Sequence, residues 1–233
     1  MKQKHKTAHA DFWKRFSQTP RFDCVKMKQD IQAKIFEEIK EMSPDERIAY
    51  FNRPGVEGRR GGVKEDPQAY GRKPARKDRR KWRLYLDTSV LGGYFDADEG
   101  WAEDSQRVIE AALSGIAIIC FSSTVAHELE GVPSRVRELW NNLPATCCEQ
   151  IAITREIEAL SAAYLAAGIV GPASIDDTLH VATATVIRAD AIVSWNFKHI
   201  VRLDRIKGYN GVNLSLGYGM IAIVSPKEIR FDD

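Results

Sequence analysis

The chain has 233 residues, 44% of them hydrophobic and 28% charged, which is typical of a globular protein and excludes wholesale disorder. Its longest apolar run, residues 116–121, is far shorter than the ~20 residues of a membrane helix, and no apolar stretch follows the basic N-terminus as in a signal peptide. We therefore expect a soluble, cytoplasmic protein of one or two domains without membrane contact.

The near-neutral net charge of +2 conceals two oppositely charged parts. Residues 1–83 hold 23 Lys and Arg against 12 Asp and Glu, a net +11, whereas residues 84–233 hold 11 against 20, a net −9. This imbalance predicts either a polyanionic partner or a basic arm that folds back onto its own acidic body.

A small helical unit is predicted over residues 1–53. One apolar stripe recurs at helical spacing: Met27, Ile31, Ile35, Ile39 and Met42. Charged residues, Lys28 among them, are expected on the other faces of that helix. Ser43-Pro44-Asp45-Glu46 then has the features of a capping box, so a second helix is expected to begin there. Two short helices cannot form a stable core alone, so the stripe needs a partner surface, either in this chain or in another protein.

Residues 54–83 are predicted to form a flexible basic linker. They contain five Gly, three Pro and eleven Lys or Arg but hardly any aliphatic side chain. Such a stretch cannot bury enough apolar surface to offset its ordering entropy. The linker is either a solvated tether or a path for RNA phosphates, along which Tyr70 and Trp82 could stack on bases.

Strands and helices alternate over residues 84–233, which predicts an α/β domain with a mostly parallel sheet flanked by helices. The expected strands are residues 84–86, 116–121, 191–194 and 221–224. The expected helices cover residues 108–115, 122–133, 134–142, 154–167 and 174–189.

Acidic residues lie where such a sheet binds ligands, beyond the carboxyl ends of its strands. Asp87 ends the first strand, and Glu128 lies early in the helix after the second. Asp176 and Asp177 begin the helix that leads to the third strand, which Asn196 follows. Converging carboxylates repel one another unless a cation neutralises them, and hard oxygen ligands favour Mg²⁺ or Mn²⁺. Such ions activate water for phosphodiester hydrolysis.

Each acid also has a structural interpretation. Asp87 could cap a helix that begins at Thr88, and Glu128 could be a solvated surface acid. One of Asp176 and Asp177 could serve only the dipole of its helix. The histidines at positions 127, 180 and 199 are expected to pack or form hydrogen bonds, because hard Mg²⁺ prefers oxygen. No single acid therefore indicates a metal site, and only their joint placement at strand ends and helix starts does.

Several segments of residues 84–233 resemble the motifs of PIN-domain ribonucleases. Residues 84–90 resemble the opening strand motif, residues 124–129 the second acidic motif and residues 177–184 the third. The tail of one toxin-like branch of that family is similar to residues 193–200, 211–214 and 217–218.

The resemblance implies a metal-dependent endoribonuclease of the kind that acts as the toxin in type II toxin–antitoxin pairs. Asp87, Glu128 and Asp177 would hold Mg²⁺ or Mn²⁺ and hydrolyse RNA. Ser89 would support the Asp87 carboxylate by hydrogen bonding, and Asp176 would be a supporting residue.

Many PIN domains carry a fourth acid where this chain has Asn196. As a supporting residue, Asn196 could still bind the metal or a metal-bound water through its amide oxygen, but it brings no charge. One metal ion is therefore better supported than two. The alternatives are a catalytically weak or inactive PIN-like module that binds nucleic acid or a partner, and a structure-specific nuclease that acts on DNA.

Residues 22–28, with the helix to Lys40 and the restart at Ser43, are similar to small antitoxin-like proteins paired with this branch. One chain would then carry a toxin and an antitoxin-like segment, although a helical extension that merely completes the core is the alternative. We predict that residues 1–83 restrain the domain at 84–233, in cis or across a homodimer, with a basic side chain in the acidic cluster competing with the metal.

Overall fold

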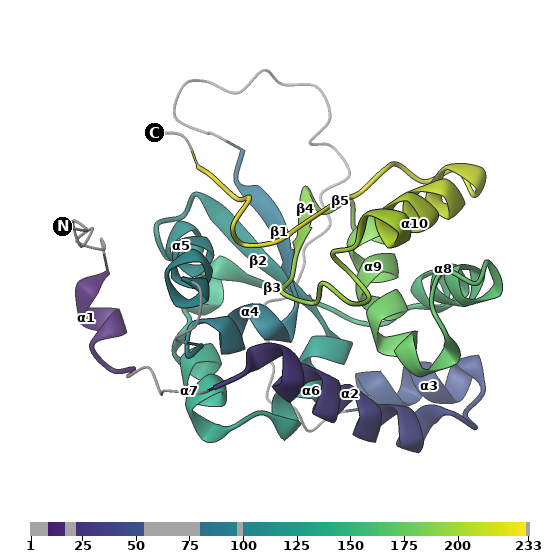
Figure 1. The fold of residues 1–233 in the computed structure, drawn as a ribbon, viewed down its shortest axis with the longest axis horizontal. Coiled ribbons are helices and arrows are strands. Elements are labelled where there is room, and N and C mark those ends of the chain that lie inside the picture. Colours follow the sequence, from purple (N-terminus) through teal and green to yellow (C-terminus); the bar gives the residue numbers. More distant parts are fainter. Residues whose placement is uncertain (1–8, 17–21, 54–79, 97–99, 232–233) are drawn as a thin grey trace.

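A five-stranded sheet forms the centre of the computed structural model, which describes residues 9–16, 22–53, 80–96 and 100–231. Neighbouring strands are parallel in the order β3-β2-β1-β4-β5. The strands are β1 (Trp82–Leu86), β2 (Ala117–Ser122), β3 (Cys148–Ile151), β4 (Ala191–Val193) and β5 (Ala222–Val224). Helices flank this sheet (Figure 1), so the predicted α/β class with a parallel sheet is confirmed.

The helices of the N-terminal part precede β1, and the others connect the strands. They are α1 (Ala10–Trp13), α2 (Cys24–Ile39), α3 (Pro44–Asn52), α4 (Thr88–Gly93), α5 (Trp101–Leu113), α6 (Ser123–Gly131), α7 (Ser134–Asn142), α8 (Arg155–Ala166), α9 (Ile175–Val186) and α10 (Leu203–Ser215), with short 3₁₀ helices η1 (Ala145–Cys147) and η2 (Pro172–Ser174). Among the described helices, none is both long and apolar enough to cross a lipid bilayer.

Several element boundaries differ from the sequence predictions. β1 begins at Trp82 rather than residue 84, because Trp82 pairs with Ala117 and its N–H donates to the Ile116 carbonyl (3.0 Å). The predicted linker therefore ends two residues earlier, and its residues 54–79, with Tyr70, lie outside the described part of the chain. α9 ends at Val186, three residues before the predicted end at residue 189. The backbone of Arg188 adopts the left-handed conformation (φ 53°), which is common just after a helix ends.

Besides the two short 3₁₀ helices, β3 and α10 were not predicted, and α4 was considered only as the helix that Asp87 could cap. The edge strand β3 reads CEQI and is only half-buried along its length, so it lacks the apolar run of a central strand. The helices α4 and α10 each contain two glycines, which are weak helix formers, and α4 has only six residues.

The apolar stripe of α2 finds its partner surface in the same chain. Ile31, Ile35 and Ile39 are buried in one continuous core with the strands of the sheet. α2 packs against α4, α6, α9 and η2, and α3 packs against α6 and α8, along the lower side of the domain in Figure 1. A Cβ atom on Gly92 of α4 would lie 2.9 Å from Met27 Cε, so glycine permits this close approach.

Candidate acidic site at the carboxyl edge of the sheet

Asp87 lies directly after β1, at the position that precedes α4. It is fully buried, yet its side chain makes no capping hydrogen bond to that helix. Its carboxylate instead accepts hydrogen bonds from the hydroxyl of Ser89 (2.9 Å) and from that of Ser194, which follows β4. The predicted bond from Ser89 is confirmed, and the capping interpretation of Asp87 is wrong because the carboxylate turns toward the sheet edge.

Glu128 reaches the same place from α6, the helix after β2. It is fully buried, so the interpretation as a solvated surface acid is wrong. Its carboxylate accepts a hydrogen bond from the Thr88 hydroxyl, and its Oε1 lies 3.1 Å from His180 Nε2. The parallel sheet brings Asp87 and Glu128 together because β1 and β2 are neighbours whose carboxyl ends meet at one edge.

Asp177 enters from the first turn of α9 and is also buried. Its Oδ1 accepts a hydrogen bond from Asn196 Nδ2 (3.0 Å), whose own Oδ1 accepts from the His199 backbone N–H (3.1 Å). The amide at position 196 therefore fixes the orientation of the Asp177 carboxylate, a role that an ionised acid could not perform because it has no donor.

Asp176 is buried but stands apart from these hydrogen bonds. Neither of its carboxylate oxygens has a hydrogen-bond partner among the described residues. Burial raises the pKa of Asp176 well above its ordinary value, and the charges of Glu128 and Asp177 add to that effect. The adjacent acids thus differ in environment: Asp177 is hydrogen-bonded within the cluster, whereas Asp176 is buried without a hydrogen bond from the described residues.

Lys28 and Gln32 of α2 complete the cluster, and neither was predicted there. Lys28 was expected on a face away from the apolar stripe, but its side chain lies beside the stripe and is 1% exposed. Lys28 Nζ forms ion pairs with Asp87 and with Glu128 (3.1 Å), and it lies 3.1 Å from His180 Nε2. The prediction that a basic side chain from residues 1–83 enters the acidic cluster is confirmed by these contacts, in cis.

Gln32 lies one helical turn after Lys28, on the same face of α2. Its Nε2 donates to Asp177 Oδ1 (2.9 Å) and to Glu128 Oε1 (3.3 Å). The signal in the sequence was that both polar residues sit beside apolar stripe positions, Lys28 after Met27 and Gln32 after Ile31. A stripe widened by one position on this side would have included both residues.

The electrostatics of the cluster follow from burial and mutual contact. Burial alone would lower the pKa of Lys28, but the carboxylates, Asp87 foremost, outweigh it and raise that pKa above its ordinary value. Burial likewise opposes the charge of Glu128, yet Lys28 and His180 hold its pKa well below the usual range. At Asp177 burial dominates, and its pKa is raised.

The donor set fits a divalent cation. Asp87, Glu128 and His180 each offer one atom, and these atoms lie within 4.8 Å of one another. Tyr85 contacts the other ring nitrogen of His180 through its hydroxyl (2.8 Å) and so fixes the ring. From the sequence, His180 was expected only to pack or to form hydrogen bonds. Its position among the possible metal ligands was not predicted. Two carboxylates and one imidazole suit Mn²⁺, and carboxylates alone suit Mg²⁺.

No family model, curated protein or solved structure matches this chain. Its function therefore has to be inferred from the chemistry of this site, since an α/β fold hosts many activities.

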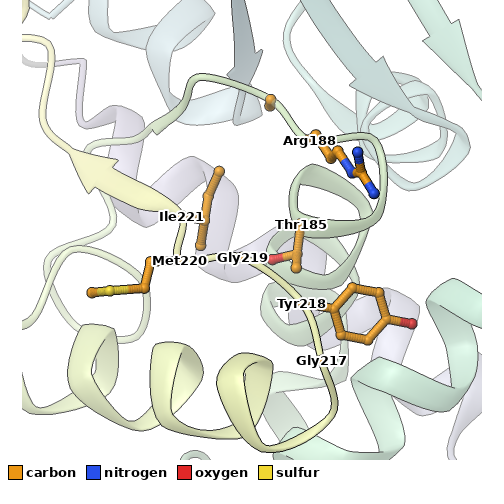
Figure 2. A pocket seen from close by; sticks show the side chains of 8 residues that line it. Thr185, Arg188, Gly217, Tyr218, Gly219, Met220 and Ile221 are labelled. Atoms are coloured by element: carbon orange, nitrogen blue, oxygen red, sulfur yellow. The ribbon is translucent and has the colours of Figure 1, made fainter.

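A separate cavity of about 320 Å³ lies at the opposite edge of the sheet. Figure 2 shows it between the end of α9 and the segment before β5. It is lined by Thr185, Arg188, Ala189 and residues 217–221. These residues precede β4 and β5, whereas the acids follow β1 and β2, so the cavity does not belong to the acidic site.

Proposed function

We propose that this protein is a metal-dependent endoribonuclease of the PIN-domain kind, restrained by its own N-terminal helices. One observation carries the proposal: the carboxylates of Asp87, Glu128 and Asp177 come from three separate elements and surround the buried ammonium of Lys28. Burying carboxylates that converge on one point costs free energy unless a cation neutralises them, so this arrangement favours a positive charge between them.

The residues around the carboxylates support a site built for a cation rather than a chance cluster. Ser89 and Ser194 bind one carboxylate, Thr88 binds the second and Asn196 binds the third, so each acid is oriented by a donor. Asp87, Glu128 and His180, with Asp177 beside them, would hold Mg²⁺ or Mn²⁺. Such an ion supplies an activated water and neutralises charge that develops on a phosphodiester.

The resemblance to PIN-domain motifs supports RNA as the substrate. The three acids that the motifs single out in the sequence are those that the fold gathers at one edge. The absence of a fourth carboxylate, at Asn196, favours a site for one ion. A toxin-like role follows from the same resemblance and belongs to the same proposal.

In this proposal, α2 and α3 act as an antitoxin-like segment that keeps the site closed. Lys28 supplies the charge that the metal would bring, and Gln32 covers Asp177. α3 anchors the segment, since Arg47 pairs with Glu158 and the Asn52 side chain makes two hydrogen bonds with the backbone of Ile153 (2.6 and 2.8 Å). A metal ion and the Lys28 ammonium cannot share the space between the same atoms, so opening must precede activity.

The test is RNA cleavage by the full chain carrying Lys28→Ala and Gln32→Ala together. With Mn²⁺ and an end-labelled single-stranded RNA, we expect this double variant to cleave at least about tenfold faster than the wild type, because the ion supplies several kcal/mol of transition-state stabilisation. The matched control is Lys34→Ala, an exposed position on the same helix, which should behave like the wild type.

Adding Asp87→Asn to the double variant should abolish the gain and exclude a contaminating nuclease. A DNA strand of the same sequence, assayed in parallel, separates a ribonuclease from a DNA-directed enzyme. If the folded double variant binds RNA in a salt-dependent manner but cleaves neither strand, the nuclease proposal fails and the non-catalytic alternative takes its place.

A further inference from the structure

Phe197 is an exposed aromatic residue that directly neighbours the acidic site in the sequence. Its side chain is 43% exposed. It directly follows Asn196, whose amide binds Asp177. Exposed apolar side chains are common on protein surfaces, so exposure alone would mean little.

The ring of Phe197 is held in place by two tryptophans. Trp101 and Trp195 stack face to face with ring centroids 4.5 Å apart. Phe197 packs at 6.2 Å from Trp101 and 6.1 Å from Trp195, inclined by about 60° to both. Trp195 is itself fixed, because it is buried and its indole N–H donates to the Ser105 hydroxyl (2.9 Å). The exposed ring is therefore presented by a rigid support rather than by a mobile loop.

Cationic residues follow the ring in the sequence. Lys198 is exposed and forms no ion pair among the described residues. Arg205 lies further along, at 3.9 Å from Asp204, which Arg202 already pairs. The segment after Asn196 thus combines an aromatic face with positive charge, the pair of features that single-stranded nucleic acid requires.

We propose that Phe197 and Lys198 form a nucleotide-binding subsite beside the acidic cluster. A base of single-stranded RNA stacks on the Phe197 ring, and an adjacent phosphate contacts Lys198. The subsite rests on the proposed function in taking RNA as its ligand. The subsite stays accessible while Lys28 occupies the cluster, because Phe197 is exposed in the structure in which α2 is packed on the domain. The restrained protein is therefore expected to bind RNA without cleaving it.

The test measures RNA affinity of the full chain without metal. A fluorescent oligouridine is titrated with protein in EDTA and its anisotropy recorded. Phe197→Ala should weaken binding at least about fivefold, as expected for the loss of one stacked base, while Phe197→Trp should retain the wild-type affinity. The matched control is Met220→Ala, an equally apolar and more exposed residue at the opposite edge of the sheet, which should not change it.

Residues 54–83 carry eleven Lys or Arg and can attract any polyanion, so the contact must also be located. Photocrosslinking with an oligo-5-bromouridine should label the tryptic peptide 189–198, which contains Phe197. Crosslinks confined to other peptides, or equal affinities of Phe197→Ala and Met220→Ala, would overturn the subsite.

The two proposals fail separately. If the Lys28→Ala/Gln32→Ala variant cleaves RNA while Phe197→Ala binds normally, only the subsite is overturned. If Phe197→Ala loses affinity while the double variant cleaves nothing, the subsite stands as a binding site and the nuclease proposal falls.

Discussion

Asp87 occupies the position where an aspartate commonly caps a helix, yet its carboxylate points to Lys28, Ser89 and Ser194. The location of the acids at the sheet edge could be predicted, because strand ends are readable from apolar runs and parallel strands align their carboxyl ends. From the sequence, an aspartate of the acidic cluster could not be distinguished from an aspartate that caps a helix, since both directly follow a strand.

The position of Lys28 in the acidic cluster could not be predicted from the sequence for a different reason. It lies 59 residues from Asp87 and 100 from Glu128 along the chain, so no local pattern links them. A lysine beside an apolar stripe is normally solvated. Only the tertiary packing of α2 on α4, α6 and α9 turns this side chain inward.

The first prediction concerns the charge balance of the cluster. Lys28→Met keeps an unbranched side chain only one heavy atom shorter but removes its charge, which leaves the buried carboxylates without compensation. We expect a loss of about 3–5 kcal/mol in the free energy of unfolding in metal-free buffer, measured by urea denaturation. Lys34→Met on the exposed face of α2 should change the stability by less than about 0.5 kcal/mol. Equal effects of the two substitutions would contradict a charge-balancing role for Lys28.

The second prediction concerns Asp176, whose pKa in the folded protein is raised by burial, Glu128 and Asp177. A carboxyl with a raised folded pKa contributes stability that is fully present below its unfolded pKa, about 3.9, and is lost as the pH rises through its folded pKa. Asp176→Asn removes this pH-dependent loss. We therefore expect the variant to be more stable than the wild type near neutral pH and no more stable near pH 4.

Unfolding of both proteins by urea at a series of pH values measures this difference. A stability gain that is the same at all pH values would show that Asp176 does not titrate with a raised pKa.

At the scale of elements, α2 and α3 were the most predictable parts of the chain. The stripe of α2 has a clear helical period, and the capping box at Ser43 and Glu46 is present in the structure. β3 and α10 could not be predicted, because an edge strand with polar residues and a helix with two glycines have weak local signals. These two elements are specified by packing rather than by propensity.

The third prediction concerns how α2 and α3 detach from the domain. Arg47 pairs with Glu158 of α8, which is 2% exposed and whose Oε2 has no hydrogen-bond partner in the described structure. Arg47→Ala leaves this carboxylate buried and unpaired, at a cost of about 3 kcal/mol. Hydrogen exchange should then become faster in the amides of α2 and α3 and remain unchanged in β1 and β4.

Glu158→Gln in the same background removes the uncompensated charge and should restore much of the protection. If Arg47→Ala instead increased exchange evenly across the sheet, the two helices would not open as a separate unit.

At the scale of the whole molecule, individual ion pairs join the N-terminal part of the chain to the acidic part. Lys28 pairs with Asp87 and Glu128, and Arg47 pairs with Glu158. The sequence predicted that the basic part either folds back or binds a polyanion. These basic side chains do fold back onto the acidic part, but most of the surplus positive charge lies outside the described residues, so the fold-back of the whole arm stays a prediction. Binding of a polyanion also stays a prediction, carried by the subsite at Phe197.

In the proposed function, the Lys28 ammonium takes the place of a divalent cation, and this replacement can be measured. It is tested most directly by Mn²⁺ binding, measured by electron paramagnetic resonance of the free ion during titration of the full chain. Lys28→Met should bind Mn²⁺ at least about tenfold more tightly than the wild type, because removal of one unit charge at contact distance is worth well over 1.4 kcal/mol in a buried site. Adding Asp87→Asn should reverse the gain. Equal Mn²⁺ affinities of the wild type and a folded Lys28→Met variant would contradict the account.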